Sequence, residues 1–288
     1  MLVISSFFVL AALLILGLTA YSITRPLHFL CREAERIGGG KFYGIEPAFS
    51  LAELEDLRAA MNRMSDRLER SDRQQRDFFQ NVSHDLRNPL MSISGYAQGI
   101  EQGVFRSPGE AAHTILEEST RLTELVNRLL TLSRLEGMQP DSEMGTVCVA
   151  ALLEDGIDRF YGLAMKEGVS LVLAPMDETL SIRGEEELLG QALDNLLSNA
   201  IRYAKTTVFV EADGDPEGIH ITVADDGKGI GAKDLLHVFE RSYKGEGGNY
   251  GIGLAIARTA VQKMNGELTA TNRPEGGAIF TIQFKTSV

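Results

Sequence analysis

The stretch that decides the fold of the central region reads Phe78-Phe79-Gln80-Asn81-Val82-Ser83-His84-Asp85-Leu86-Arg87-Asn88-Pro89-Leu90. On a helix that turns about 100° per residue, its apolar side chains and those that follow fall within an arc of about 120°. His84 lies on the opposite side of the helix. We therefore expect an amphipathic helix that presents an imidazole to solvent. The members of the arc are Phe78, Phe79, Val82, Leu86, Leu90, Ile93, Ala97, Ile100 and Val104.

The residues around His84 suit a nucleophile. Asp85 follows it directly, and its carboxylate can accept the proton of one ring nitrogen and make the other nitrogen more nucleophilic. Pro89 removes the hydrogen bond to the carbonyl of Asp85 and bends the helix. Asn88 lies one turn beyond His84, where its amide can orient a water. From this stretch alone, an ordinary surface histidine remains the alternative.

A second amphipathic helix follows Ser107-Pro108-Gly109 and extends to about Glu136. Two such helices joined by a short turn form a hairpin, and each has one apolar face. Two hairpins would close as a four-helix bundle, so the pattern predicts a homodimer. The apolar face of the second helix consists of Leu116, Leu122, Leu125, Val126, Leu129 and Leu132.

The N-terminal segment predicts a membrane anchor. Residues 1–24 contain no charged side chain, and about 20 apolar helical residues span the hydrocarbon core of a bilayer. Arg25 is the first charge, so the positive-inside rule places the remainder of the chain in the cytoplasm. A cleaved signal peptide that ends near Ala20 is the alternative, but it would lack a basic start. We expect a single-pass anchor, with no extracellular sensor domain in this chain.

Residues 25–80 alternate in charge, and Gly38–Gly40 and Pro47 divide them into two helical pieces. The second piece, from about Leu51 to Arg76, carries one narrow apolar stripe. We expect that a monomer cannot bury such a stripe, which again indicates a dimer. A solvated single helix is the alternative. The stripe consists of Leu54, Leu57, Met61, Met64 and Leu68.

From about Thr146 the pattern changes to mixed strands and helices, which predicts an α+β sandwich with antiparallel neighbours. The expected strands are 169–173, 180–182, 208–212, 219–223, 267–271 and 278–284. The expected helices are 150–166, 185–203 and 252–264.

Three motifs in this half indicate a nucleotide site. Asn195 and Asn199 lie one turn apart on the flank of an apolar helix, where two amide oxygens can hold Mg²⁺. Asp225 shares the inward parity of its strand and can accept the amine of adenine. The adjacent Gly227 and Gly229 let the backbone close over a flat base. A structural Asn pair and a plain turn at Asp225 are the alternatives.

The third motif is a glycine run before a helix, Gly247-Gly248-Asn249-Tyr250-Gly251-Ile252-Gly253. Free N–H groups and the helix dipole make such an N-terminus an anion site. The run is neither a Rossmann fingerprint nor a Walker A loop, because the preceding strand and the G-K-[ST] sequence are both missing.

Composition excludes several classes of function. The net charge of −12 and the pI near 5.0 leave no basic excess for phosphate contacts, so direct nucleic-acid binding is not expected. The two cysteines, Cys31 and Cys148, lie far apart, which excludes a disulfide scaffold and a cysteine-built metal site.

Taken together, the order and spacing of these motifs resemble the catalytic core of a bacterial sensor histidine kinase. Residues 25–27 and 53–64 resemble the HAMP linker of bacterial receptors. The motifs are S-H-D-L-R-N-P-L at 83–90, N-L-L-S-N-A at 195–200, D-D-G-K-G-I at 225–230, V-F-E-R-S-Y-K at 238–244, G-I-G-L-A-I-A at 251–257 and G-G-A-I-F-T-I at 276–282.

The resemblance implies a role for each residue. His84 would be the phosphoacceptor, Asp85 its acid/base neighbour and Asn88 a phosphatase-type amide. The cofactors would be ATP and Mg²⁺, and the partner would be a cognate response regulator that receives the phosphate on an aspartate. The residues implied to bind ATP and Mg²⁺ are Asn195, Asn199, Arg202, Tyr203, Asp225, Gly227, Gly229, Lys244, Gly251 and Gly253.

The expected architecture is multidomain. A transmembrane helix covers residues 1–23, a helical HAMP-like linker 24–76, a dimeric phosphoacceptor hairpin 77–138 and an α+β ATP-binding domain 145–288. The lid before Gly251 is short, Ser242 replaces a bulkier residue, and Ala278 stands where many members have threonine. The functional alternative is a non-catalytic membrane adaptor that binds nucleotide as a structural ligand.

Overall fold

The computed structural model describes residues 2–46, 48–49, 51–138, 144–241, 243 and 251–285. The chain divides into two compact units, Met1–Phe79 and Gln80–Val288. Each unit is described by itself below.

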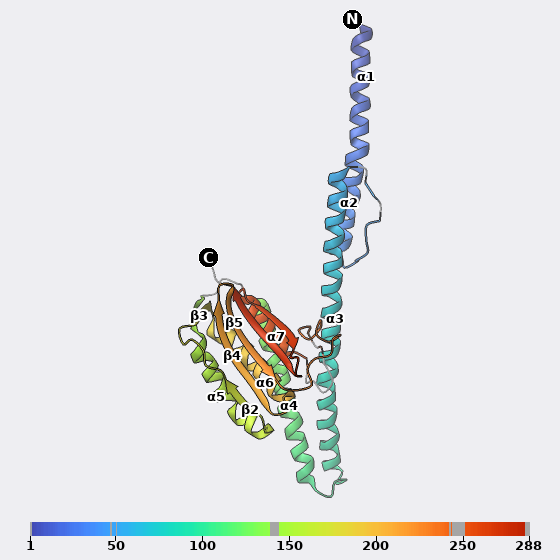
Figure 1. The fold of residues 1–288 in the computed structure, drawn as a ribbon. Coiled ribbons are helices and arrows are strands. Elements are labelled where there is room, and N and C mark those ends of the chain that lie inside the picture. The colour runs from blue at the N-terminus through green and yellow to red at the C-terminus, as the bar shows by residue number, and fades with distance from the viewer. Residues whose placement is uncertain are drawn as a thin grey trace. The chain divides into compact units, whose positions relative to one another are not determined.

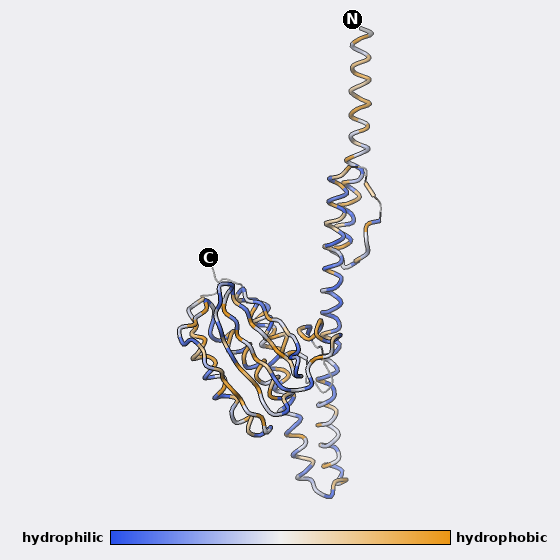
Figure 2. Tube along the Cα trace, in the orientation of Figure 1, coloured by the Kyte–Doolittle hydropathy of each residue, from blue (hydrophilic) through white to orange (hydrophobic). Residues whose placement is uncertain are grey.

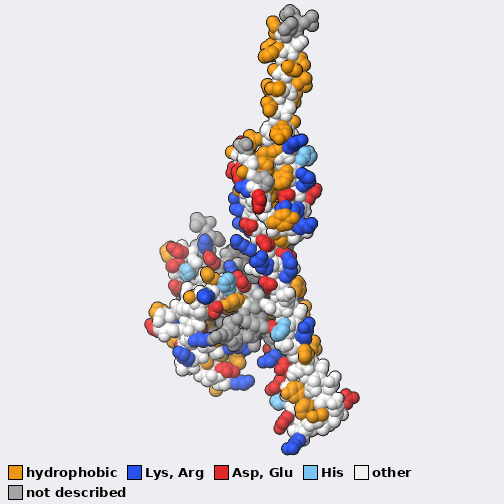
Figure 3. All heavy atoms as spheres, turned by 90° about the vertical axis from the view of Figure 1, so that its right-hand side faces the viewer, with side chains coloured by type: hydrophobic (Ala, Val, Ile, Leu, Met, Phe, Trp, Pro, Cys, Tyr) orange, Lys and Arg blue, Asp and Glu red, His pale blue; other side chains and the backbone are white. Residues whose placement is uncertain are grey.

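The first unit begins with a continuous helical segment. It comprises α1 (Leu2–Thr19), a π-helical turn η1 (Ala20–Thr24) and α2 (Arg25–Gly38). From Ile4 to Leu18 the large apolar side chains of α1 are exposed, and Figures 2 and 3 show hydrophobic residues along this part of the helix. Within the described residues, helix Ile4–Gly38 is long and apolar enough to cross a membrane by its length and composition.

Helix α2 and the start of α3 (Ala52–Glu101) enclose a small apolar core together with the segment between them. The expected break after Gly38 is confirmed, whereas Pro47 lies outside the described residues. The core corrects one expectation, because Leu54 and Met61 are buried within a single chain. Leu57, Met64 and Leu68 remain exposed. The buried members of this core are Leu30, Ile37, Ile45, Leu54 and Met61.

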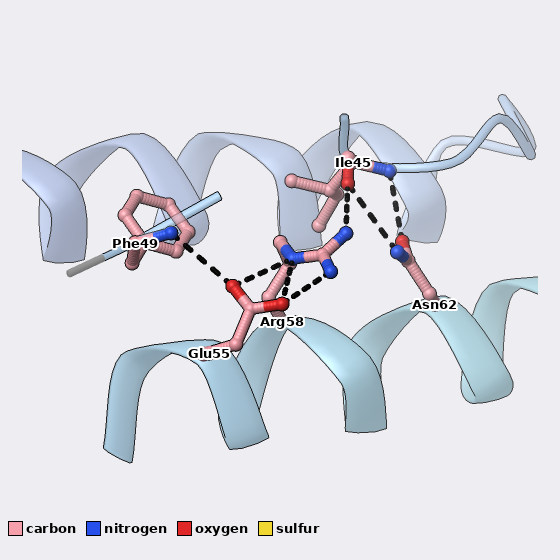
Figure 4. Close-up of polar contacts among 5 residues, drawn as sticks. All are labelled: Ile45, Phe49, Glu55, Arg58 and Asn62. Carbon is pink, nitrogen blue, oxygen red and sulfur yellow. Dashed lines mark hydrogen bonds and ion pairs between the residues drawn. The ribbon is translucent and has the colours of Figure 1, made fainter. Parts of the chain in front are cut away.

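Polar side chains of α3 hold the connecting segment in place (Figure 4). The side-chain oxygen of Asn62 accepts the N–H of Ile45 at 2.8 Å. Arg58 donates to the carbonyl of Ile45 at 2.7 Å and pairs with Glu55. Glu55 in turn accepts the N–H of Phe49 at 3.2 Å. These bonds satisfy backbone groups that have no helical or strand partner.

The second unit contains the helical hairpin. Helix α3 runs through Pro89 without a break, so the expected division between residues 76 and 77 falls inside one helix of 50 residues. Helix α4 covers Pro108–Gly137. At the turn, Gly103 has a φ of 66°, and the rings of Tyr96 and Phe105 stack with their centroids 5.5 Å apart.

The remainder of the second unit is a mixed sheet with three helices. Strands β2 (Ser170–Leu173), β4 (Thr207–Asp215), β5 (Gly218–Asp225), β7 (Ala278–Lys285) and β6 (Glu267–Asn272) lie in that order. All pairs are antiparallel except β2 with β4, which is parallel and corrects the expected pattern. β1 (Gly145–Cys148), which the sequence did not reveal, pairs with β3 (Ser181–Gly184).

One face of the sheet carries the core. Along β4, β5 and β7 alternate side chains are buried, among them Val210, Val223 and Phe280. Helices α5 (Val149–Glu167), α6 (Glu186–Tyr203) and α7 (Gly253–Lys263) supply the rest of the core (Figure 1). Leu189, Leu193 and Leu196 of α6 are fully buried. The three helices therefore lie within one or two residues of their expected ranges.

Candidate nucleotide and phosphoacceptor site

His84 projects from α3 into solvent, as expected, with 68% of its side chain exposed. Its Nδ1 lies 3.7 Å from Oδ1 of Asp85, whose side chain is only 9% exposed. The carboxylate therefore faces Nδ1, and Nε2 is the ring nitrogen left for chemistry. Asn88, one turn further on, is exposed as well.

A cavity of about 680 Å³ lies at the edge of the sheet and α6. Most of the expected nucleotide ligands meet in its lining. Those present are Asn195, Asn199, Arg202, Tyr203, Asp225, Gly229, Gly251 and Gly253. Lys244 and Ser242 lie outside the described residues.

Asp225 ends β5 and is 1% exposed. Its Oδ1 accepts the N–H of Gly227 at 2.8 Å and the N–H of Ala278 at 3.3 Å. Burial raises the pKa of Asp225, although these two hydrogen bonds act in the opposite direction. Both donors reach the same oxygen, so Oδ2 is the atom available to a ligand in the cavity.

Gly227 is an expected ligand that is not part of the described cavity lining. It packs instead against the carbonyl of Tyr203, where a Cβ atom would overlap that oxygen. Its N–H fixes the carboxylate of Asp225. Gly227 therefore acts through Asp225, whereas Gly229, with a φ of 73°, lines the cavity itself.

The neighbouring Asp226 joins the end of β5 to the loop after α6. Its carboxylate accepts the N–H of Lys205 at 2.8 Å and the N–H of Thr206 at 3.0 Å. Partial burial alone would raise the pKa of Asp226, but these bonds and the Thr206 hydroxyl outweigh it and lower the pKa. Of the two adjacent aspartates, one therefore faces the cavity and the other is structural.

Helix α6 and the N-terminus of α7 also contribute to the cavity. Asn195 donates Nδ2 to the carbonyl of Gln191 at 2.8 Å, which directs its Oδ1 toward Gly253. A Cβ atom on Gly253 would lie only 2.8 Å from that oxygen. The first intrahelical bond of α7 runs from the N–H of Ile256 to the carbonyl of Ile252. Among the described residues the preceding N–H groups have no helical acceptor, so they can bind an anion.

The donor set also fits a magnesium ion that shares its ligands with phosphate. Asn195 and Asn199 both line the cavity, and Oδ1 of Asn195 is directed toward Gly253. Within the described residues, no group of three or more histidine, cysteine or acidic side chains could enclose a metal. Mg²⁺ commonly keeps waters and substrate phosphates as ligands and needs few protein ligands.

Sequence reasoning missed several lining residues, among them Lys228, Asp234 and Tyr243. The hydroxyl of Tyr243 donates to Asp234, and this contact raises the pKa of Tyr243. The two residues are nine positions apart, and the described residues between them form turns, so no local pattern connects them. Ala278, noted for its lack of a hydroxyl, also lines the cavity.

Comparison with known proteins agrees with this geometry. The family model described as "His Kinase A (phospho-acceptor) domain" matches residues 74–137. The model described as "Histidine kinase-, DNA gyrase B-, and HSP90-like ATPase" matches residues 184–288.

Three curated relatives show how far the similarity extends. Sensor histidine kinase YcbM of Bacillus subtilis is 30% identical over 217 residues, which cover 71% of this chain and 70% of YcbM. Heme sensor protein HssS of Staphylococcus saprophyticus is 31% identical over 276 residues, covering 93% of this chain and 59% of HssS. BaeS of Escherichia coli is 28% identical, covering 95% and 60% respectively. The chain thus spans about three fifths of the latter two.

Among solved structures, histidine kinase AdeS of Acinetobacter baumannii has the same fold, with a TM-score of 0.58 and 24% identity. The match covers 71% of this chain and 98% of that of AdeS. The chain belongs to the bacterial two-component sensor histidine kinases.

Proposed function

We propose that this chain is a membrane-anchored kinase that phosphorylates its own His84 from ATP and passes the phosphate to an aspartate of a response regulator. The proposed parts are a membrane helix over 1–23, a HAMP-like linker over 24–76, a dimerising hairpin over 77–138 and an ATP-binding domain over 145–288. The protein would act as a homodimer with its catalytic part in the cytoplasm.

One observation carries this proposal. A single chain combines an exposed histidine beside a carboxylate with a cavity whose two halves suit the two halves of ATP. Asp225 offers an oxygen for the adenine amine. Asn195, Asn199 and the N-terminus of α7 suit Mg²⁺ and the phosphates. Lys244, which the resemblance implies as a further cation for the nucleotide, lies outside the described residues.

The transfer step follows from the groups around His84. Nε2 attacks the γ-phosphorus, a nitrogen–phosphorus bond forms, and the bond from that phosphorus to the β–γ bridging oxygen breaks and releases ADP. Asp85 holds the Nδ1 side of the ring, which keeps the lone pair on Nε2. The first N–H groups of α7 would neutralise charge on the phosphates, and Mg²⁺ held by Asn195 and Asn199 would supply further positive charge there.

The proposal is tested with the purified full chain and ATP labelled on the γ-phosphate. We expect a protein-bound phosphate that is labile to acid and stable to base. It should move to a purified regulator that carries an acceptor aspartate. Absence of the label in a chain that binds ATP would instead support the nucleotide-binding adaptor.

Asp225→Asn tests the adenine role in the same assay. The substitution replaces a charged acceptor with a neutral amide. The NH₂ group of that amide can face the adenine amine, and it cannot accept a hydrogen bond from it. The loss is about 1.5–3 kcal/mol, roughly tenfold to a hundredfold in ATP affinity. Unchanged affinity in a direct titration would refute the role assigned to Asp225.

A further inference from the structure

Helix α4 of the hairpin contributes a cation to the nucleotide cavity. Arg128 lies in the lining with Asn195 and Gly253, although it belongs to none of the motifs that indicated the site. Its side chain is half-buried. The hairpin therefore supplies the cavity with a guanidinium as well as carrying the candidate phosphoacceptor.

Arg128 approaches the phosphate end of the cavity. A Cβ atom on Gly253 would lie 3.4 Å from Nη1 of Arg128 and 2.8 Å from Oδ1 of Asn195. Because Gly253 has no side chain, both polar groups come close to the first turn of α7. The guanidinium of Arg128 and Oδ1 of Asn195 thus lie beside the first N–H groups of α7. Asp225 is held separately, by the N–H groups of Gly227 and Ala278.

Contacts at the far end of the two helices keep α4 beside α7. Lys263, at the end of α7, donates to the carbonyl of Met138. Arg241, which precedes α7 in the sequence, pairs with Glu136 of α4 at 2.7 Å. Arg128 lies near Gly253, and ten residues later in both segments Met138 contacts Lys263. The two helices therefore run in the same direction. This alignment places Arg128 at the N-terminus of α7.

The geometry points to Arg128 as a ligand of the terminal phosphates of the bound nucleotide, a role that rests on the proposed kinase function. A guanidinium can make two parallel hydrogen bonds to phosphate oxygens and stays charged at all relevant pH values. The chain carries a net charge of −12, which repels a polyphosphate ligand, so a cation beside the phosphates would favour binding. The nucleotide then links the hairpin to the ATP-binding domain, and ATP does so more strongly than ADP.

The test compares ATP, ADP and adenosine as ligands of the full chain in detergent, at a fixed Mg²⁺ concentration. The variants are Arg128→Ala, Arg128→Lys and the control Arg121→Ala. Arg121 lies two turns earlier on α4, with 60% of its side chain exposed, and pairs with Glu118.

We expect Arg128→Ala to weaken ATP binding by about tenfold or more, ADP binding by less and adenosine binding not at all. Arg128→Lys should recover part of the loss, and Arg121→Ala should match the wild type for all three ligands.

Two results would overturn the role of Arg128. One is an unchanged ATP affinity in Arg128→Ala. The other is an equal loss for adenosine and ATP, which would mean that Arg128 only supports the fold. If the wild-type chain binds none of the three ligands, the proposed kinase function falls and the role of Arg128 falls with it. Asp225→Asn should weaken all three ligands alike, which separates the adenine contact from the phosphate contact.

Discussion

The helical hairpin and the ATP-binding domain bury their apolar residues to different degrees. In the domain, Leu189, Leu193 and Leu196 of α6 are completely enclosed. In the hairpin, Phe79 is 58% exposed and Leu116 is 64% exposed, although both lie on the apolar faces that the sequence predicts. The domain thus completes its core within one chain, and the hairpin does not.

This difference shows what each region needs from its surroundings. Contiguous exposed apolar surface on a helix usually marks an interface. A second copy of the hairpin would cover it in a four-helix bundle. The nucleotide cavity, by contrast, is assembled by one chain, with contributions from α4, α6, β5 and α7. We therefore expect nucleotide binding and phosphoryl transfer to respond separately to mutation.

The largest separation should come from His84→Gln. The variant should lose autophosphorylation completely and bind ATP with unchanged affinity, because His84 is absent from the described lining of the cavity. The measurement is label incorporation together with ATP titration. His113→Gln is the matched control, since the side chain of His113 is 71% exposed on α4. Label retained in His84→Gln would contradict the choice of nucleophile.

The same leucine-to-alanine change should affect folding stability in one region and dimerisation in the other. Leu193→Ala leaves a cavity in a fully buried site and should lower the free energy of unfolding of the domain by about 2–5 kcal/mol. Leu116→Ala should leave that free energy unchanged and weaken dimerisation instead. Calorimetry and sedimentation at several protein concentrations measure the two effects. Equal destabilisation by both variants would remove the distinction.

Much of the domain could be predicted from sequence because its elements have regular periods. Strand β7 alternates apolar and polar residues, and α6 repeats its leucines at three- and four-residue steps. Strand β1 buries only one of its four residues, Val147, so it shows no alternation of apolar and polar positions. The parallel pairing of β2 with β4 joins segments separated by α6, so no local pattern reveals it.

The residues of the candidate site also divide into those that a local sequence pattern predicts and those that it does not. Asp225, Asn195 and Gly253 stand in recognisable local motifs, and all three line the cavity. Arg128 lies on α4, where the sequence period indicates only which face of the helix is apolar. The packing of α4 against α7 brings Arg128 to the cavity, and no local pattern in the sequence shows this packing. The burial of two members of the stripe on the first part of α3 was missed for a related reason. The residues that cover Leu54 and Met61 come from α2 and the connecting segment, which no helical period on α3 can show.

A smaller effect within the domain should distinguish the two adjacent aspartates. Asp226→Asn loses charge-assisted acceptors for the backbone N–H groups of Lys205 and Thr206. We expect a loss of about 1 kcal/mol in the free energy of unfolding at neutral pH.

The loss should depend on pH in a defined direction. The pKa of Asp226 is lowered in the folded state, so its stabilisation is complete above the ordinary pKa and fades as the pH falls through the folded value. The difference between wild type and Asp226→Asn should therefore be largest at neutral pH and shrink below about pH 4. A pH-independent difference in denaturant titrations would rule out ionisation as its cause.

The finest comparison lies inside the hairpin, between His84 and Asn88, one helical turn apart. Asp85, not Asn88, faces Nδ1 of the ring, so Asn88→Ala should leave autophosphorylation nearly intact. When a phosphorylated regulator docks beside His84, the exposed amide of Asn88 can align the water that attacks the acyl phosphate. Its removal should slow dephosphorylation of the regulator several-fold, in line with the loss of one positioning contact.

The decay of a phosphorylated regulator, followed with wild-type or Asn88→Ala protein and ADP, measures this effect directly. Asn81→Ala is a suitable control, because Asn81 is another exposed asparagine of α3, one turn before His84. Equal decay with both variants, or an equal loss of both activities in Asn88→Ala, would show that Asn88 only supports the helix around Pro89. Slow decay with retained phosphate donation would instead show that one exposed face of the hairpin serves two reactions through two different side chains.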